Sequence, residues 1–150
     1  MKKIFILLVI FTFFACSDTE KKSMVTATES TLLPGISKVY VDYQEALDAA
    51  KVSNKNMFIL FQTEGCRWCK KLKATTLQDP TLIQQLNESF VVLVLDRDKS
   101  QYPDQYHVGG VPTVYMVSNK GEIYVERVGY RKDPKAYSKW FEYVKIESGL

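Results

Sequence analysis

Two continuous apolar runs dominate the hydrophobic pattern of the chain. Met57–Phe61 and Phe90–Leu95 are apolar at every position, which is typical of central strands that are buried on both faces of a sheet. Two more strands are expected at 114–117 and 122–128, because the segment Asn119-Lys120-Gly121 between them is a turn signal for a hairpin. The pattern therefore predicts at least four strands.

Helical periodicity separates these strands. Asp79-Pro80 and Asp133-Pro134 each place a capping carboxylate before a proline that fits the first turn of a helix. The connection between residues 96 and 110 is expected to hold one short helix near Tyr102–His107. The longer helices are expected over residues 41–52, 66–77, from 79 onward, and 133–147.

The order of these elements predicts an α/β fold. A strand–helix–strand crossover is followed by a β-hairpin and a closing helix, which gives a mixed sheet of four to five strands with helices on both faces. The fifth strand would lie at or before Val39. The chain has 150 residues, enough for one domain, which is expected over residues 38–150.

The N-terminus departs from this globular pattern. Lys2 and Lys3 precede an apolar run, Ile4–Ala15, that is too short to span a bilayer comfortably and is typical of a secretory signal. Residues 1–15 are therefore expected to be a cleaved signal peptide. Residues 16–37 are largely polar and predict a tether. The alternative for the end of this segment is an ordered strand around Thr31–Leu33.

The charge balance limits the range of partners. The formal net charge is +3, and it falls to about +1 when Lys2 and Lys3 are removed with the signal peptide. A chain this close to neutral does not favour nucleic acid as a partner, and none is expected. A monomer is the default expectation.

Cys66 and Cys69 are the candidate catalytic residues. A disulfide between residues three apart closes a very small loop and would stabilise the fold little, so the pair is expected to serve chemistry. Cys66 would stand at the start of a helix, where the helix dipole and free N–H groups lower the pKa of a thiol. Cys66 is thus the expected nucleophile and Cys69 the resolving thiol.

Several neighbours of the pair have two interpretations each. Arg67 could add positive charge near Cys66 or be solvated. Trp68 could present its ring to a substrate or pack on the domain's own surface. Glu64 is the nearest acidic candidate to accept a proton from Cys69, although a glutamate in a turn is more often only solvated. His107, the only histidine, is expected on a surface loop.

A run of lysines follows the pair, at positions 70, 71 and 73. These residues could attract acidic partners, but the favoured interpretation is the solvated face of a helix. No metal site is expected, because two thiols and a distant histidine fall short of a closed zinc site.

Two motifs together resemble the thioredoxin fold. The first is Cys66-Arg67-Trp68-Cys69 at a strand-to-helix junction, and the second is Gly109-Gly110-Val111-Pro112-Thr113 before a later strand. The resemblance implies that Pro112 has a cis peptide bond and lies against the dithiol. It also implies that the backbone of Val111 pairs with an incoming peptide.

Within that superfamily the segment Thr63–Leu72 is more similar to periplasmic bacterial proteins, such as the C-terminal domains of the DsbD type and SoxW-like proteins, than to housekeeping thioredoxin. Leu60 occupies the place of thioredoxin's buried aspartate. The segment Phe13-Phe14-Ala15-Cys16 resembles a lipobox, which implies acylation of Cys16 and attachment to a lipid bilayer. The expected location is the periplasmic side of the bacterial envelope, with the outer membrane slightly favoured.

The resemblance implies a thiol–disulfide oxidoreductase that acts on disulfides of envelope proteins and needs no cofactor beyond the Cys66–Cys69 disulfide. A reductase, fed by a DsbD-like membrane electron donor, is favoured over an isomerase or an oxidase. The roughly 20 residues between Cys69 and Phe90 leave no room for the helical insert that oxidases of the DsbA type carry. The alternatives are a Cu(I)-binding module and a scaffold that binds partners with a permanent disulfide.

Overall fold

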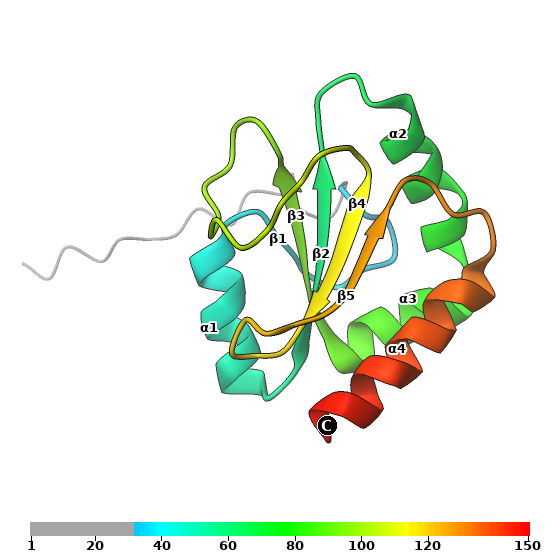
Figure 1. Cartoon of the computed structure of the whole chain (residues 1–150). Helices are drawn as coiled ribbons and strands as arrows, with labels where there is room; N and C mark the ends of the chain where they lie inside the picture. Colours follow the sequence, from blue (N-terminus) through cyan, green and yellow to red (C-terminus); the bar gives the residue numbers. More distant parts are fainter. Residues whose placement is uncertain (1–31) are drawn as a thin grey trace, which may run out of the picture.

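A five-stranded mixed sheet forms the centre of the computed structural model, which describes residues 32–150 (Figure 1). The strand order is β1-β3-β2-β4-β5. β1, β3 and β2 run parallel, and β4 and β5 are antiparallel to their neighbours. The fifth strand expected near Val39 is therefore present. The strands are β1 (Val39–Tyr40), β2 (Asn56–Gln62), β3 (Phe90–Asp96), β4 (Thr113–Val117) and β5 (Ile123–Val128).

Helices cover both faces of the sheet, as predicted. α1 lies on one face, and α3 and α4 lie on the other, with α2 at the end of the sheet where β2 finishes (Figure 1). Among residues 32–150, no helix is long and apolar enough to cross a membrane. The helices are α1 (Tyr43–Ser53), α2 (Arg67–Ala74), the short 3₁₀ helix η2 (Thr76–Gln78), α3 (Pro80–Ser89) and α4 (Pro134–Ser148).

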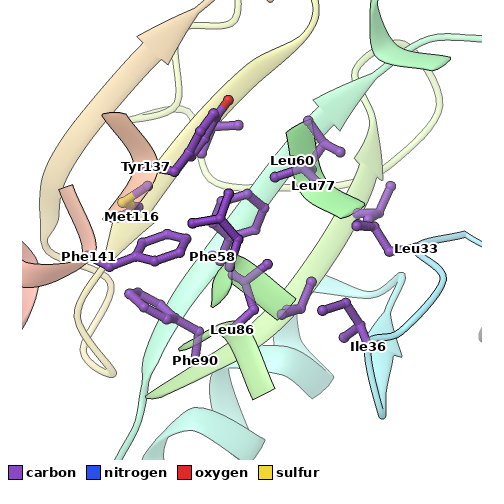
Figure 2. Close-up of a cluster of buried hydrophobic side chains, with 14 of the residues drawn as sticks. Leu33, Ile36, Phe58, Leu60, Leu77, Leu86, Phe90, Met116, Tyr137 and Phe141 are labelled. Carbon is purple, nitrogen blue, oxygen red and sulfur yellow. The ribbon is translucent and has the colours of Figure 1, made fainter. Parts of the chain in front are cut away.

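The alternation of side chains along β2 divides the core into two layers. Successive residues of a strand point to opposite faces. Phe58 and Leu60 accordingly join the cluster beneath α3 and α4 (Figure 2), whereas Met57, Ile59 and Phe61 join the cluster beneath α1. All five side chains are fully buried. This explains why the strand has no polar position along its apolar run.

Aspartates fix the starts of three helices. The Asp42 carboxylate accepts the N–H of Glu45 at 2.9 Å, and Asp79 accepts those of Thr81 and Leu82 at 3.0 and 3.1 Å. Asp133 caps α4 in the same way. Such caps satisfy N–H groups that have no partner inside the helix. The starts predicted from Asp79-Pro80 and Asp133-Pro134 are therefore confirmed.

The segment that enters the sheet is folded onto α3. Leu33 and Ile36 are 0% and 5% exposed and belong to the core, and Gly35 lies so close to Ile83 that a Cβ would be 2.8 Å from its Cδ1. The Asn87 side chain donates to the Gly35 carbonyl and accepts the Ser37 N–H. The part of the predicted tether from 32 to 37 therefore belongs to the domain.

The structure describes only part of the N-terminal region for which the sequence makes predictions. The predicted signal peptide, Cys16 and the tether up to residue 31 lie outside the described residues. Leu32 and Leu33 form a turn rather than the alternative strand, because their backbone bends into the contacts with α3.

Two predicted helices differ from the structure. The helix expected over 66–77 ends at Ala74 and is followed by η2, because the backbone of Thr75 leaves the helical region. The short helix expected near Tyr102–His107 is wrong. This segment forms only a turn at residues 104–105, where the buried Tyr106 is held by a hydrogen bond to Tyr43 and by aromatic contacts with Phe61.

Replacing Leu33 by alanine is expected to destabilise the fold by about 2–5 kcal/mol, because it removes a fully buried side chain and leaves a cavity. Chemical denaturation of the purified protein measures this change. Val52→Ala is the control: Val52 is 89% exposed, and its truncation should change stability by no more than about 0.5 kcal/mol. Equal stability of the two variants would contradict the assignment of residues 32–37 to the domain.

Candidate active site

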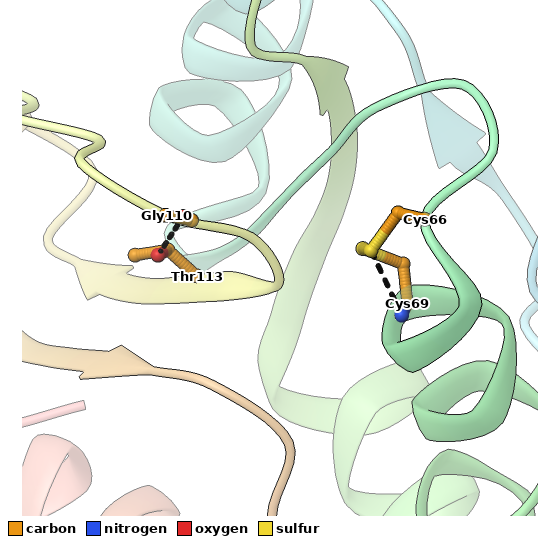
Figure 3. The surroundings of a disulfide bond; sticks show 4 residues. All are labelled: Cys66, Cys69, Gly110 and Thr113. Atoms are coloured by element: carbon orange, nitrogen blue, oxygen red, sulfur yellow. Dashed lines mark hydrogen bonds between the residues drawn. A yellow bond between two sulfur atoms is a disulfide. The ribbon is translucent and has the colours of Figure 1, made fainter.

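Cys66 and Cys69 lie where β2 gives way to α2. The strand ends at Gln62, Gly65 takes a positive φ of 79°, and Cys66 is the N-cap residue of α2. The two sulfurs form a disulfide with an S–S distance of 2.09 Å (Figure 3). Cys69 is only 1% exposed, whereas Cys66 is partly exposed. One sulfur of the pair can therefore meet a partner molecule and the other is shielded by the domain.

The sulfur of Cys66 also serves as the cap of the helix. The Cys69 N–H donates a hydrogen bond to Cys66 Sγ at 3.1 Å (Figure 3). The first turn of α2 has no acidic residue, so the positive end of the helix dipole at Cys66 is not offset by a carboxylate of that turn. Both features favour a thiolate at Cys66 in the reduced protein.

The loop before β4 carries the second sequence motif. The Val111–Pro112 peptide bond is cis, which confirms the conformation that the resemblance implied. The Thr113 hydroxyl donates to the Gly110 carbonyl at 2.7 Å (Figure 3), and the Gly129 N–H donates to the Pro112 carbonyl at 2.7 Å. The first bond closes the loop on itself, and the second joins it to the residue that follows β5.

Trp68 has one face against the domain and retains an exposed surface. Its ring stacks on Tyr130, with ring centroids 5.5 Å apart and an angle of 25° between the planes, yet the residue is 43% exposed. Trp68 and Tyr130 line an open groove of about 290 Å³, together with Val111, Pro112 and Gly129. Both interpretations of Trp68 therefore have support in the structure: it packs on its own domain and borders a groove beside the dithiol.

Arg67 and Lys71 lie against the aromatic pair. The Arg67 guanidinium carbon is 5.1 Å from the Trp68 ring centroid, and Lys71 Nζ is 5.1 Å from the same centroid and 5.2 Å from that of Tyr130. Cations at such positions are attracted by the electron density of the ring face. Arg67 is exposed and thus combines solvation with a contact to Trp68.

Comparison with known proteins agrees with this geometry. Residues 43–145 match the family described as "Thioredoxin-like domain". The chain belongs to this family. The fold is the thioredoxin fold, and the five-stranded sheet and flanking helices predicted from the sequence are confirmed.

Several known proteins are similar to this thioredoxin-like chain over part of its length. It is 34% identical over 71 residues to a protein disulfide-isomerase of Zea mays, a match that covers 47% of the chain and 14% of that protein. It thus spans about one seventh of the length of this relative. A Thermus thermophilus thioredoxin has a TM-score of 0.62 at 24% identity, covering 73% of this chain and 88% of its own. The DsbD C-terminal domain of Neisseria meningitidis has a TM-score of 0.55 at 23% sequence identity, and the match covers 69% of this chain and 97% of that domain.

Glu64 forms an ion pair with Lys99 in this thioredoxin-like domain. Its carboxylate accepts a hydrogen bond from Lys99 Nζ at 2.7 Å, and the side chain is 84% exposed. The Lys99 ammonium holds the pKa of Glu64 below its ordinary value. Among the described residues, no hydrogen bond joins Glu64 to Cys69. The position fits the solvated alternative better than a proton acceptor for the buried thiol.

The remaining candidates also have defined places. Leu60 is fully buried, so an apolar side chain stands at the position of thioredoxin's buried aspartate. His107 is exposed on the loop before β4, as predicted. Residues 32–150 contain no group of three or more histidine, cysteine or acidic side chains placed to hold a metal ion. Cys66 and Cys69 therefore have no third ligand of these types in the described part.

Sequence reasoning missed Gly129 and Tyr130. Tyr130 is 62 positions from Trp68, and nothing in the local pattern shows that the two rings stack. The available signal was an aromatic residue following a glycine at the end of the last strand. Gly129 has a positive φ of 85°, which lets the chain turn from β5 toward α2.

In the reduced protein, Cys66 is expected to react with iodoacetamide at least about tenfold faster than Cys69 at pH 7, because it is accessible and its thiolate is stabilised at the helix start. Mass spectrometry of the single variants Cys66→Ser and Cys69→Ser measures each thiol separately, and the urea-unfolded variants serve as the control. Equal rates in the folded variants would contradict the assignment of Cys66 as the more reactive thiol.

Proposed function

We propose that this thioredoxin-like protein is a thiol–disulfide oxidoreductase that reduces disulfides of other proteins in the bacterial envelope. The observation that carries the proposal is the unequal pair at the start of α2, with Cys66 accessible and Cys69 buried. A dithiol reductase needs one thiolate that can reach the substrate and a second that is protected until the first has reacted.

The exchange proceeds in two steps. The Cys66 thiolate attacks one sulfur of the substrate disulfide, forms a Cys66–substrate disulfide and releases the other substrate sulfur as a thiolate. The Cys69 thiolate then attacks Cys66 Sγ, releases the second substrate thiolate and leaves the Cys66–Cys69 disulfide seen in the structure. The substrate gains two electrons, which the protein loses, and each released thiolate takes up a proton from water.

The groove beside the dithiol supports a peptide substrate. Trp68, Val111 and Pro112 give it an apolar surface, and Trp68 stands between the two cysteines in the chain. No backbone hydrogen bond occupies the N–H of Val111 within the described chain. An extended segment around a substrate cysteine could therefore pair with this backbone while its side chains contact Trp68.

The environment of Cys66 supports reduction over oxidation. Strong oxidants of this kind have a reduced form that is greatly stabilised. Here one N–H donates to Cys66 Sγ, and two cations of α2, Arg67 and Lys71, lie over the Trp68 ring. A thiolate stabilised mainly by the start of the helix favours the reductase over a strong oxidant.

The envelope location rests on the sequence. The apolar N-terminal run and Cys16 at its end support a lipid-anchored protein on the periplasmic side, with the outer membrane slightly favoured. In this location the oxidised pair would be reduced again by a membrane dithiol protein of the DsbD kind, which returns two electrons and two protons to Cys66 and Cys69.

The reduction potential of the Cys66–Cys69 pair is expected near the reducing end of the known scale, closer to about −270 mV than to about −120 mV. Equilibration of the protein against dithiol–disulfide buffers measures it. A value near the oxidising end would contradict the reductase and favour an oxidase or an isomerase.

Cys69→Ser should accumulate a mixed disulfide with a peptide substrate, whereas Cys66→Ser should form none. A mixed disulfide at Cys69 alone would reverse the assigned roles.

Replacing Cys16 by serine is expected to abolish incorporation of radiolabelled palmitate and to release the protein from the membrane fraction of a Gram-negative host. The matched control is Ser17→Ala, which leaves the cysteine in place. Membrane association that persists in Cys16→Ser would contradict the lipid anchor and leave the proposed redox chemistry of Cys66 and Cys69 untouched.

A further inference from the structure

Six basic residues lie on or near the helix that begins at the dithiol. They come from two segments, α2 and the stretch that follows β5, and neither stretch, 67–73 or 130–132, contains a carboxylate. We name this set the cationic face. It consists of Arg67, Lys70, Lys71, Lys73, Arg131 and Lys132.

Hydrogen bonds hold the two segments of the cationic face together. The Thr76 hydroxyl, just after α2, donates to the carbonyl of Arg131 at 2.7 Å and lies 3.3 Å from that of Lys132. The Thr75 hydroxyl lies 3.3 Å from the Tyr130 hydroxyl, and Lys71 Nζ is 5.2 Å from the Tyr130 ring centroid. The two segments that carry the six cations are therefore in contact with each other.

No residue of the cationic face forms an ion pair within the described chain. The three ion pairs among residues 32–150 involve Lys51, Arg97 and Lys99, none of which belongs to the cationic face. Residues 32–150 contain 16 basic and 14 acidic side chains, and removing the six leaves 10 against 14. The remainder of the domain is therefore net negative, and the uncompensated positive charge is concentrated beside the active site.

Two of the cations, Lys70 and Lys73, are close enough to oppose each other. Partial burial lowers the pKa of Lys73, and the charge of Lys70 lowers it further. Like charges held near each other disfavour the protonated state. An incoming anion would relieve this repulsion as well as form new contacts.

The cationic face adjoins the groove through Tyr130, whose ring stacks on Trp68. We infer that the cationic face binds acidic segments of the partner protein, next to the disulfide presented to Cys66. The inference rests on the proposed function and names the class of substrate: proteins with aspartate or glutamate residues flanking the exchanged cysteine. Complementary charge raises the rate of encounter and fixes the orientation of docking.

An anionic membrane surface is the less favoured occupant. Cys66 and Trp68 lie at the start of α2, the helix that carries four of the six cations. Contact of this face with lipid headgroups would cover the accessible sulfur and the exposed part of Trp68. A peptide segment can bind the cations and still deliver its disulfide to Cys66.

The test compares three peptides that each hold one disulfide and differ only in flanking residues: four glutamates, four lysines or four serines. The full chain in nonionic detergent, with its dithiol reduced, is mixed with each peptide, and the initial rate of peptide reduction is measured at low and high salt. The acidic peptide is expected to react at least about tenfold faster than the basic one at low ionic strength, with the ratio falling toward one at about 0.5 M salt.

Lys70→Glu/Lys132→Glu reverses two exposed charges of the cationic face without altering a groove residue. It should reduce the acidic-to-basic rate ratio at least about fivefold. The ratio, taken within one variant, cancels any change in the intrinsic reactivity of Cys66. The matched control is Lys120→Glu/Lys139→Glu, which changes the net charge equally at two exposed positions outside both segments and should retain the ratio.

Equal rates for the acidic and basic peptides would overturn the inference, and so would a preference that survives in Lys70→Glu/Lys132→Glu. A chain that reduces none of the peptides contradicts the proposed function instead. Recognition is then measured by binding of the same peptides to Cys66→Ser/Cys69→Ser, where equal affinities overturn the cationic face as a docking surface. Tight binding to phosphatidylglycerol vesicles with no peptide preference would also overturn it in favour of a membrane contact.

Discussion

The parallel pairing of β2 with β3, buried on both faces, is the constraint on which the rest of the structure depends. Every residue of β2 from Asn56 to Gln62 pairs with one of β3, and the alternating side chains form the middle of both core layers. A pair of strands this apolar needs helices on both sides. α1 and α3 provide them, and their placement leaves the carboxyl end of β2 free to lead into the loop and α2 (Figure 1).

The unequal exposure of Cys66 and Cys69 follows from that arrangement of β2, β3 and the helices. Because α2 starts a few residues beyond the end of β2, its N-cap residue Cys66 lies at the surface, whereas Cys69 in its first turn faces the core. Cys66 and Cys69 thus differ in exposure although only two residues separate them. The loop of Pro112 and the end of β5 border the same region because β4 lies beside β2 and β5 beside β4. The groove between these segments therefore results from the order of the strands in the sheet.

Local signals in the sequence were sufficient for much of this architecture. The two apolar runs, the Asp-Pro helix starts and the spacing of the cysteines each depend on neighbouring residues. The features that escaped prediction depend on contacts between distant segments. The stack of Trp68 on Tyr130, the ion pair of Glu64 with Lys99 and the burial of Leu33 against α3 are of this kind. The local sequence around Lys99 or Tyr130 does not indicate which distant residue the fold brings into contact with it.

The capping role of Cys66 links the start of α2 to the redox state of the dithiol. The atom that accepts the Cys69 N–H is the same sulfur that exchanges partners. A thiolate at this position is a better acceptor than a disulfide sulfur, since it carries a full charge. Reduction is therefore expected to strengthen the hydrogen bond at the start of α2 as it breaks the cross-link. The same sulfur can cap the helix in both redox states, so loss of the disulfide does not remove the cap.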